Sequence, residues 1–280
     1  MRLGGPIFAN CPDPETWAQA VRQAGYRAAY CPLVPSADDN TVRTYAAAAA
    51  AADIVIGEVG AWSNPLSPDP ATRKEALGKC IAGLALAERI GARCCVNIAG
   101  SRGTKWDGPC PLDLAPDTFD LIVEMVRTII DAVQPRRSFY TLETMPWMLP
   151  DSAASYLRLL KAIDRQAFAV HLDPVNLVNC PALAFDTAAL LRECFATLGP
   201  HIRSCHAKDI RLDTKLTVHL DEVRPGLGTL DYAVYLRELS RLDPDVPLLL
   251  EHLPNQAEFT LAADHIRALA AREGLRLDRP

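Results

Sequence analysis

The amino-acid sequence predicts an α/β fold, a single-domain (β/α)8 TIM barrel, and three observations lead to that prediction. Short apolar segments with strand character alternate with longer segments of helical periodicity along the whole 280-residue chain. Eight such units in about 250 residues is the usual count for this barrel. No linker or shift in composition divides the chain, so we assign residues 1–280 to one domain.

The predicted strands are short apolar runs that are followed by polar or turn-forming residues. They cover residues 3–9, 26–31, 54–62, 92–100, 138–145, 168–175, 202–210 and 246–253. The first helix opens at Asp13 with Pro14 in its first turn, which is a typical capping signal. The remaining helices are predicted at 38–53, 70–90, 116–133, 151–164, 186–198, 230–242 and 256–272. A doubly wound open sheet is the alternative, but no GxGxxG sequence follows the first strand.

Composition restricts the classes of partner. The chain has 29 basic and 34 acidic residues, a net charge of −5, so it lacks the basic surface that holds nucleic acid. The uncharged run around Ala46–Ala52 is too short and too weakly apolar to cross a membrane. Nine cysteines without a CxxC pair, and an N-terminus without targeting features, predict a reduced, cytoplasmic protein. The oligomeric state is left open, with a homo-oligomer as one option.

Four consecutive predicted strands end in a residue type that binds metal ions. In a (β/α)8 barrel the active site forms at the C-terminal ends of the strands. Side chains alternate along a strand, and one phase of that alternation points Glu143, Asp173, His206 and Glu251 inward together. Burying three carboxylates in the barrel mouth without a cation would cost roughly several kcal/mol of folding free energy. One imidazole and three carboxylates suit Mn²⁺, Mg²⁺ or Co²⁺ with positions open for substrate.

Other polar residues near the strand ends are candidates for substrate contacts. Lys208 follows His206 in the same inward phase; it either donates to a substrate oxygen or leaving group, or forms a salt bridge with a carboxylate. Glu58 and Asn97, at the ends of the third and fourth strands, are predicted to line the opposite wall. His171 is predicted to steady Asp173 from one layer deeper, and His252 is interpreted as a packing or interface residue.

Several motifs together resemble one known group. These are LET at Glu143, HLDPVN around Asp173, HAKD around His206, PGLGTLDY at residues 225–232, and LLLEHL around Glu251. In order and spacing they resemble the xylose-isomerase-like TIM-barrel superfamily of sugar isomerases and epimerases. The resemblance spans the whole chain. It implies one divalent metal held by Glu143, Asp173, His206 and Glu251, with Mn²⁺ expected and Mg²⁺, Co²⁺ or Zn²⁺ as alternatives.

The chain departs from this family pattern at the mouth of the barrel. Ketose 3-epimerases of the superfamily commonly carry a histidine three residues after the aspartate, where this chain has Asn176. Trp147 follows the fifth strand, and Trp62 and Trp106 follow the third and fourth, which gives a more apolar mouth than a free sugar requires. These tryptophans either stack on a substrate or pack over the rim.

The predicted function is a metal-dependent sugar isomerase or epimerase. A metal that chelates a carbonyl and its neighbouring hydroxyl stabilises the enediolate formed when a proton leaves. Glu143 and Glu251 would approach the substrate from opposite faces, one removing a proton and the other returning one. The alternative is a lyase or dehydratase acting on a keto-sugar, keto-glycoside or keto-cyclitol with Lys208 as the acid, and a non-catalytic barrel is the third hypothesis. Relatives of endonuclease IV and true xylose isomerases fit less well, since the chain has few histidines and Asp209 is predicted to point outward.

Overall fold

The structure is a computed structural model that describes residues 1–277, and its strands form a closed barrel. Around the ring the order is β1-β2-β3-β4-β5-β6-β7-β10, and every neighbouring pair is parallel. This arrangement confirms the predicted fold class. The barrel strands are β1 (Arg2–Gly4), β2 (Ala28–Tyr30), β3 (Val55–Gly60), β4 (Cys94–Asn97), β5 (Phe139–Glu143), β6 (Phe168–Leu172), β7 (Ile202–Ala207) and β10 (Pro247–Leu250).

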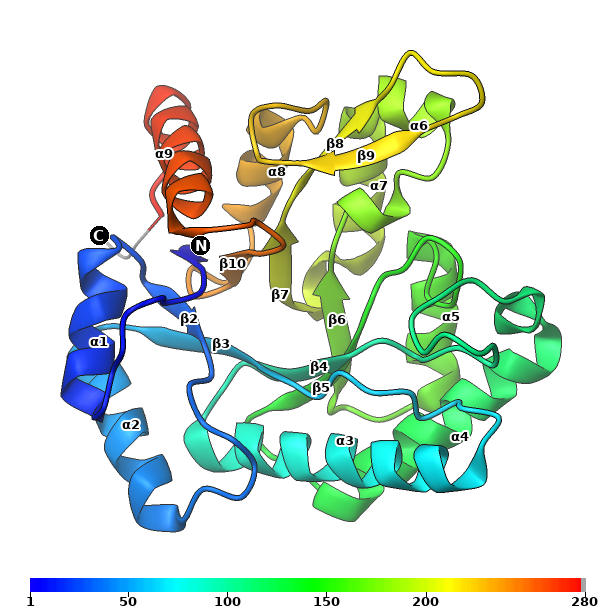
Figure 1. Cartoon of the computed structure of the whole chain (residues 1–280), viewed down its shortest axis with the longest axis horizontal. Coiled ribbons are helices and arrows are strands. Elements are labelled where there is room, and N and C mark those ends of the chain that lie inside the picture. Colours follow the sequence, from blue (N-terminus) through cyan, green and yellow to red (C-terminus); the bar gives the residue numbers. More distant parts are fainter. Residues whose placement is uncertain (278–280) are drawn as a thin grey trace.

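Helices surround these strands, as Figure 1 shows for α3, α4 and α5. Asp13 caps the first α-helix as predicted, and Asp38 and Asp69 cap the next two in the same way, by accepting hydrogen bonds from backbone amides. Within residues 1–277, no helix is both long and apolar enough to cross a bilayer. The α-helices are α1 (Pro14–Gln23), α2 (Asp39–Ala51), α3 (Pro70–Ile90), α4 (Pro116–Val133), α5 (Ala153–Ile163), α6 (Pro181–Phe185), α7 (Thr187–Leu198), α8 (Tyr232–Leu239) and α9 (Gln256–Arg272). Short 3₁₀ segments are η1 (Pro111–Leu114), η2 (Val175–Leu177) and η3 (Gly199–His201).

The region after β7 differs from the prediction. The expected strand at 202–210 ends at Ala207, and the chain then forms an antiparallel hairpin of β8 (Asp209–Leu212) and β9 (Leu220–Val223). This hairpin stands beside α6 at the edge of the barrel (Figure 1). Neither the hairpin nor α6 was predicted from the sequence. Both lie on connections between barrel units, where insertions are tolerated.

One buried arginine closes the ring at its first strand. Both terminal nitrogens of Arg2 donate to the carboxylate of Asp53, each at 2.9 Å, and its Nε donates to Asp245 at 2.9 Å. Asp53 precedes β3 and Asp245 precedes β10. The Arg2 side chain therefore ties the N-terminal strand to segments on both sides of it, with two parallel charged hydrogen bonds to one carboxylate.

Candidate metal centre

The four side chains that the sequence assigns to a metal meet at one end of the barrel. Nδ1 of His206 lies 2.8 Å from Glu251 Oε1, 3.1 Å from Glu143 Oε1 and 3.6 Å from Asp173 Oδ2. One ligand atom from each of the four residues lies within 4.8 Å of the others. Glu143 ends β5, Asp173 follows β6, His206 lies in β7 and Glu251 follows β10. The cluster thus occupies the C-terminal end of four adjacent strands.

Backbone contacts aim Asp173 at this cluster. Its Oδ1 accepts hydrogen bonds from the amides of Val175 at 3.0 Å and Asn176 at 3.3 Å. The hydroxyl of Thr144 donates to the Asp173 carbonyl at 2.7 Å and accepts from its amide at 3.1 Å. With one carboxylate oxygen and the backbone fixed in this way, the second oxygen, Oδ2, is the one presented to the cluster.

Two tyrosines of the helical layer hold the end of β7. Tyr235 donates to the carbonyl of His206 at 2.9 Å, and Tyr232 donates to the carbonyl of Lys208 at 2.7 Å. Both tyrosines belong to α8 and are fully or almost fully buried. The positions of His206 and Lys208 are therefore set by packing between β7 and α8 as well as by the barrel.

Lys208 reaches into the same cluster. Its Nζ lies 2.5 Å from Glu251 Oε1, 2.8 Å from Asp173 Oδ2 and 3.6 Å from Glu143 Oε1. Its side chain is only 2% exposed. The salt bridge considered in the sequence analysis is thus present, and the ammonium group also borders the cavity described below.

The charges of the cluster perturb one another strongly. Burial raises the pKa of Glu143 to about 7, although His206 and Lys208 act in the opposite direction. Glu251 is also buried, but His206 and Lys208 outweigh burial and lower its pKa to about 2. Burial would lower the pKa of His206, yet Glu251 and the other neighbouring carboxylates raise it well above its ordinary value. Three carboxylates in one small volume thus require positive charge next to them.

The donor set fits a divalent cation. Oδ2 of Asp173 and Oε1 of Glu251 are buried and have no hydrogen bond of regular geometry among the described residues, despite their short contacts with Lys208. Two such oxygens, with Glu143 and the imidazole of His206, form a mixed oxygen and nitrogen set that Mn²⁺ and Mg²⁺ accept. A bound cation would also keep the three carboxylates ionised.

A cavity of about 720 Å³ opens above the cluster. Nε1 of Trp147 donates to the carbonyl of Asp107 at 2.9 Å, which joins the loop after β5 to the loop that carries Trp106. The remaining wall is largely apolar. Of the residues predicted to contact substrate or metal, those that line this cavity are Trp62, Trp106, Trp147, Asn176, Glu143, Lys208 and Glu251.

The cavity also contains residues that sequence reasoning missed. One of them is Glu222, from hairpin strand β9, whose Oε2 lies 3.2 Å from Nδ1 of His252. His252, interpreted from the sequence as a packing or interface residue, lines the cavity. Alternating residues at 217–223 could have indicated the strand that carries Glu222. Tyr30 and Phe259 complete the aromatic wall.

The prediction that Asn97 lines the cavity wall is wrong. Its Oδ1 accepts from the amide of Ser63 at 3.1 Å, and its Nδ2 lies 3.2 Å from Cys80 Sγ in α3. Asn97 is paired with Leu142, the residue beside Glu143 that faces away from the barrel interior. The alternation on β4 is therefore shifted by one residue from the one assumed, and Ile98 lines the cavity instead.

Glu58 and His171 do not contact the cavity either. Both are buried, and Nδ1 of His171 lies 3.3 Å from Oε2 of Glu58. His171 was predicted to steady Asp173, but it is aligned with Glu143 and Ser204 in the sheet and points at Glu58. Burial, reinforced by the charge of His206, lowers the pKa of His171 to about 4, so the ring is neutral near pH 7.

Asp209 is buried outside the barrel interior and organises the loop before α8. Its carboxylate accepts hydrogen bonds from four backbone amides, those of Ile210, Gly226, Gly228 and Leu230, at 2.9–3.0 Å. A Cβ atom at Gly228 would lie 2.3 Å from Asp209 Oδ1, so only glycine permits this approach. The PGLGTLDY motif therefore has a structural explanation, since it wraps the carboxylate that follows Lys208.

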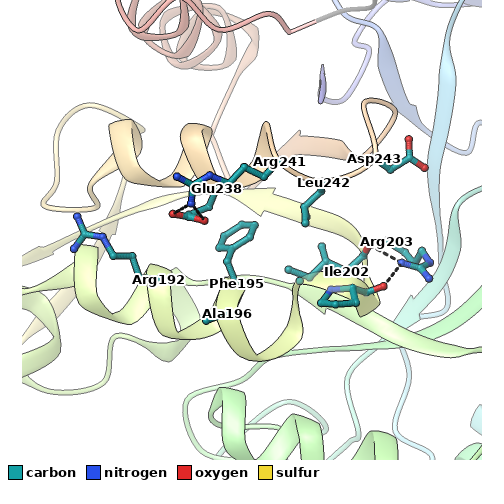
Figure 2. Close-up of a pocket in the computed structure, with 11 residues that line it drawn as sticks. Arg192, Phe195, Ala196, Ile202, Arg203, Glu238, Arg241, Leu242 and Asp243 are labelled. Atoms are coloured by element: carbon teal, nitrogen blue, oxygen red, sulfur yellow. Dashed lines mark hydrogen bonds and ion pairs between the residues drawn. The ribbon is translucent and has the colours of Figure 1, made fainter.

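A second cavity, of about 730 Å³, lies at the opposite end of β7, between α7 and α8 (Figure 2). Arg241 is paired with Glu238, and Arg203 donates to the carbonyls of Pro200 and Ile202. These charged groups therefore have partners within the same surface. No group of metal-binding side chains was found here in the described part of the chain.

Comparison with known proteins identifies the family. Residues 18–273 match the xylose isomerase-like TIM barrel family, and the chain belongs to it. No curated protein sequence matches the chain. The match covers the cluster and all the strands that carry it, which confirms the resemblance drawn from the motifs.

Solved structures share the fold at low sequence identity. D-psicose 3-epimerase from Clostridium cellulolyticum, solved with D-tagatose, has 16% identity and a TM-score of 0.66, with 100% of each chain covered. The probable 3-DHS dehydratase AsbF from Bacillus anthracis has 19% identity and a TM-score of 0.67, with 91% of this chain and 92% of that chain covered. Endonuclease IV from Thermus thermophilus has 14% identity and a TM-score of 0.70, with 97% of this chain and 100% of that chain covered. Proteins with this fold thus have several activities, so the activity of this chain must be inferred from the residues of its site.

Proposed function

We propose that this chain is a divalent-metal-dependent isomerase or epimerase that acts on a small carbohydrate carrying a carbonyl group. The observation that carries the proposal is the convergence of Glu143, Asp173, His206 and Glu251 beside a cavity that Glu143 and Glu251 line. When bound there, Mn²⁺, or alternatively Mg²⁺, Co²⁺ or Zn²⁺, supplies a Lewis acid that polarises the carbonyl and acidifies the neighbouring C–H bond. The structural likeness to D-psicose 3-epimerase is consistent with this choice of reaction.

Glu143 and Glu251 are the two proposed proton carriers. Both line the cavity, and one oxygen of each lies close to Nδ1 of His206, at 3.1 Å for Glu143 and 2.8 Å for Glu251. Nδ2 of Asn176 donates to Glu143 Oε1 at 3.2 Å and so helps to fix this carboxylate. In an epimerase one carboxylate removes a proton from one face of the substrate, and the other delivers a proton to the opposite face.

Lys208 is the proposed electrophilic donor. Its ammonium group borders both the cavity and the carboxylates, so it can donate to a substrate oxygen that becomes negatively charged as the proton leaves. Asn176, Trp62, Trp106 and Trp147 are proposed to contact the rest of the substrate. Glu58, His171 and Asn97 are not proposed as substrate contacts.

A lyase or dehydratase is the second candidate function. It begins with the same proton removal but then expels a substituent from the adjacent carbon, which requires an acid near the leaving group. Lys208 at the cavity edge and the aromatic rim favour it, because a keto-glycoside or keto-cyclitol places a bulky group near both. The likeness to the probable dehydratase AsbF is consistent with this reaction.

Nucleic acid is not proposed as the substrate, although endonuclease IV shares the fold. The net charge of −5 opposes binding of a polyanion. In addition, within residues 1–277 the lysine side chains that line the aromatic cavity are Lys105 and Lys208, and Lys208 is already surrounded by carboxylates. We propose a small-molecule substrate and a cytoplasmic location.

The test is a product assay in D₂O with a panel of ketoses and keto-glycosides, with and without Mn²⁺. The proposal predicts Mn²⁺-dependent incorporation of deuterium next to the carbonyl, together with formation of an epimer or isomer. Release of a substituent would favour the lyase instead. A protein that binds no divalent ion and catalyses no exchange would support the non-catalytic hypothesis and contradict both enzyme proposals.

A further inference from the structure

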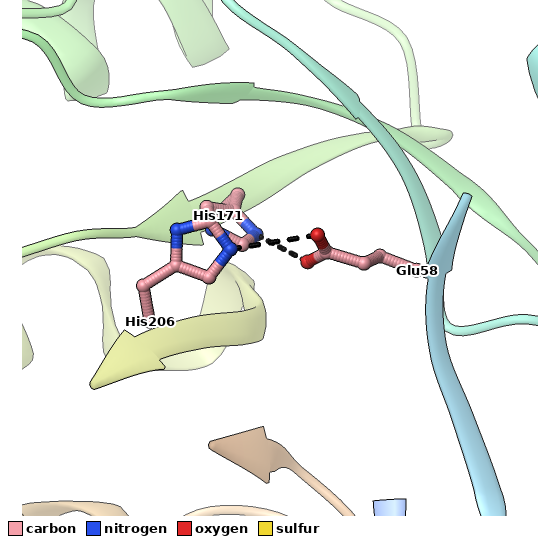
Figure 3. A group of neighbouring side chains, drawn as sticks. All are labelled: Glu58, His171 and His206. Atoms are coloured by element: carbon pink, nitrogen blue, oxygen red, sulfur yellow. Dashed lines mark hydrogen bonds and ion pairs between the residues drawn. The ribbon is translucent and has the colours of Figure 1, made fainter. Parts of the chain in front are cut away.

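A second polar group lies directly beneath the metal-ligand cluster. Glu58 of β3 is buried, with Oε1 3.4 Å from Nε2 of His206 and Oε2 3.3 Å from Nδ1 of His171. Ser204 of β7 donates to the same Oε2 at 3.3 Å. Figure 3 shows the carboxylate of Glu58 facing both imidazole rings. Three polar side chains thus surround one carboxylate inside the barrel.

The ring of His206 connects this deeper group to the cluster above. Its Nδ1 faces the carboxylates of Glu143, Asp173 and Glu251, whereas its Nε2 faces Glu58. An imidazole that binds a metal through Nδ1 keeps its proton on Nε2, and that N–H needs an acceptor in a buried site. The Oε1 atom of Glu58 lies where such an acceptor is required.

We propose that Glu58 is a positioning residue that fixes the orientation and tautomer of His206, and that the hydrogen bond from Ser204 holds Glu58 in place while His171 packs against its carboxylate. This inference rests on the proposed function, because it takes His206 as a metal ligand through Nδ1. A carboxylate behind a metal-binding histidine makes the ring more basic, and removing such a partner typically lowers metal affinity about 10- to 100-fold.

A second cation held by Glu58, His171 and His206 is the competing explanation, since their ligand atoms also lie close together. The geometry favours the positioning role for two reasons. A metal on Nε2 would displace the proton of His206 and leave the ring bridging two cations. The three residues are also completely or almost completely buried, which leaves no side open to substrate.

The first experiment measures Mn²⁺ binding to Glu58→Gln by calorimetry. Thr141→Val is the matched control, because Thr141 is buried in β5 and donates to the carbonyl of Cys95 rather than to this group. We expect one ion per chain in every protein, with affinity lowered about 10- to 100-fold in Glu58→Gln and unchanged in the control. Affinity within twofold of wild type, equal weakening in both variants, or loss of a second bound ion would each overturn the proposal.

The second experiment uses the unmodified protein and is therefore independent of how well the variant folds. Long-range ¹H–¹⁵N spectra of histidine-labelled protein, recorded with and without Zn²⁺, identify the ring nitrogen that binds the ion and the one that keeps its proton. We expect the zinc-responsive His206 ring to bind through Nδ1 and to be protonated at Nε2. The opposite tautomer would overturn the positioning role, whereas failure of wild type to bind any ion would overturn the proposed function itself.

Discussion

The two halves of the barrel differ in one respect around the cavity, because the proposed metal ligands come from one half. That half contains β5, β6, β7 and β10. Glu143 ends β5, and Asp173, Lys208 and Glu251 directly follow β6, β7 and β10. The half that contains β2, β3 and β4 provides Tyr30, Trp62 and Ile98, together with Lys105 and Asp107 from the loop after β4. Aromatic side chains come from both halves, because Trp147 follows β5, so the halves differ in the proposed metal ligands and not in the apolar wall.

The largest effect on turnover should follow from substituting the proposed metal ligands. His206→Ala and Asp173→Asn each remove a proposed metal ligand, so we expect loss of the bound ion and a fall in turnover of about a thousandfold or more. Elemental analysis of the purified variants, together with the product assay, checks this. If both variants kept the metal stoichiometry of wild type, the ligand assignment would be wrong.

A large effect is also expected from the two carboxylates. Glu143→Gln and Glu251→Gln should each reduce net turnover in both directions by about 10²- to 10⁴-fold, because each removes one proton carrier. Each variant should retain part of the solvent-deuterium exchange of one epimer, through the carboxylate that remains. This is measured by mass spectrometry at saturating Mn²⁺. Normal exchange of both epimers in either variant would contradict the two-base assignment.

A smaller and more selective effect is expected at the aromatic rim of the cavity, to which Trp147 belongs through the loop after β5. Trp147→Ala should raise KM for a substrate with a bulky apolar substituent by about tenfold, equivalent to about 1.4 kcal/mol, and barely change KM for a free ketose. Steady-state kinetics on the two substrates checks this. Melting temperature and metal content serve as controls, because the Trp147 side chain also donates a hydrogen bond to the carbonyl of Asp107 in the neighbouring loop. Equal changes for the two substrates would assign Trp147 to rim packing.

The smallest effect is expected at the cavity on the opposite end of β7. Arg241 is 69% exposed and pairs with Glu238 one turn earlier in sequence, so Arg241→Ala should change the free energy of unfolding by no more than about 0.5 kcal/mol. Turnover and metal content should equal those of wild type. A clear loss of activity in this variant would show that catalysis depends on both ends of the barrel.

The sequence was most informative where one physical rule governs a long segment. Alternation of strand and helix patterns was enough to predict the closed barrel, and strand ends were enough to bring Glu143, Asp173, His206 and Glu251 together. The barrel imposes both results, because inward residues at the ends of parallel strands have little room to separate.

The errors arose where a one-residue difference or a tertiary contact decides the outcome. Asn97 was assigned to the wrong face because β4 contains only four residues, and so short a strand does not define its own alternation. The partner of His171 depends on depth in the barrel interior and on a register shift between β6 and β7, which alternation along one strand does not give. Hairpin β8–β9 lies in a connection whose length is free to vary, so no periodic signal of the barrel required it.

The four hydrogen bonds from backbone amides to the Asp209 carboxylate affect where the chain tolerates an insertion or new termini. They fix the start of the β8–β9 hairpin and the loop that follows it. Both ends of this segment are therefore held in place without any contribution from the tip of the hairpin. The tip itself is exposed, and Leu216 is 99% accessible to solvent. Residues 214–218 are therefore a suitable place for inserting a tag, a reporter domain or new termini by circular permutation while Lys208 keeps its position.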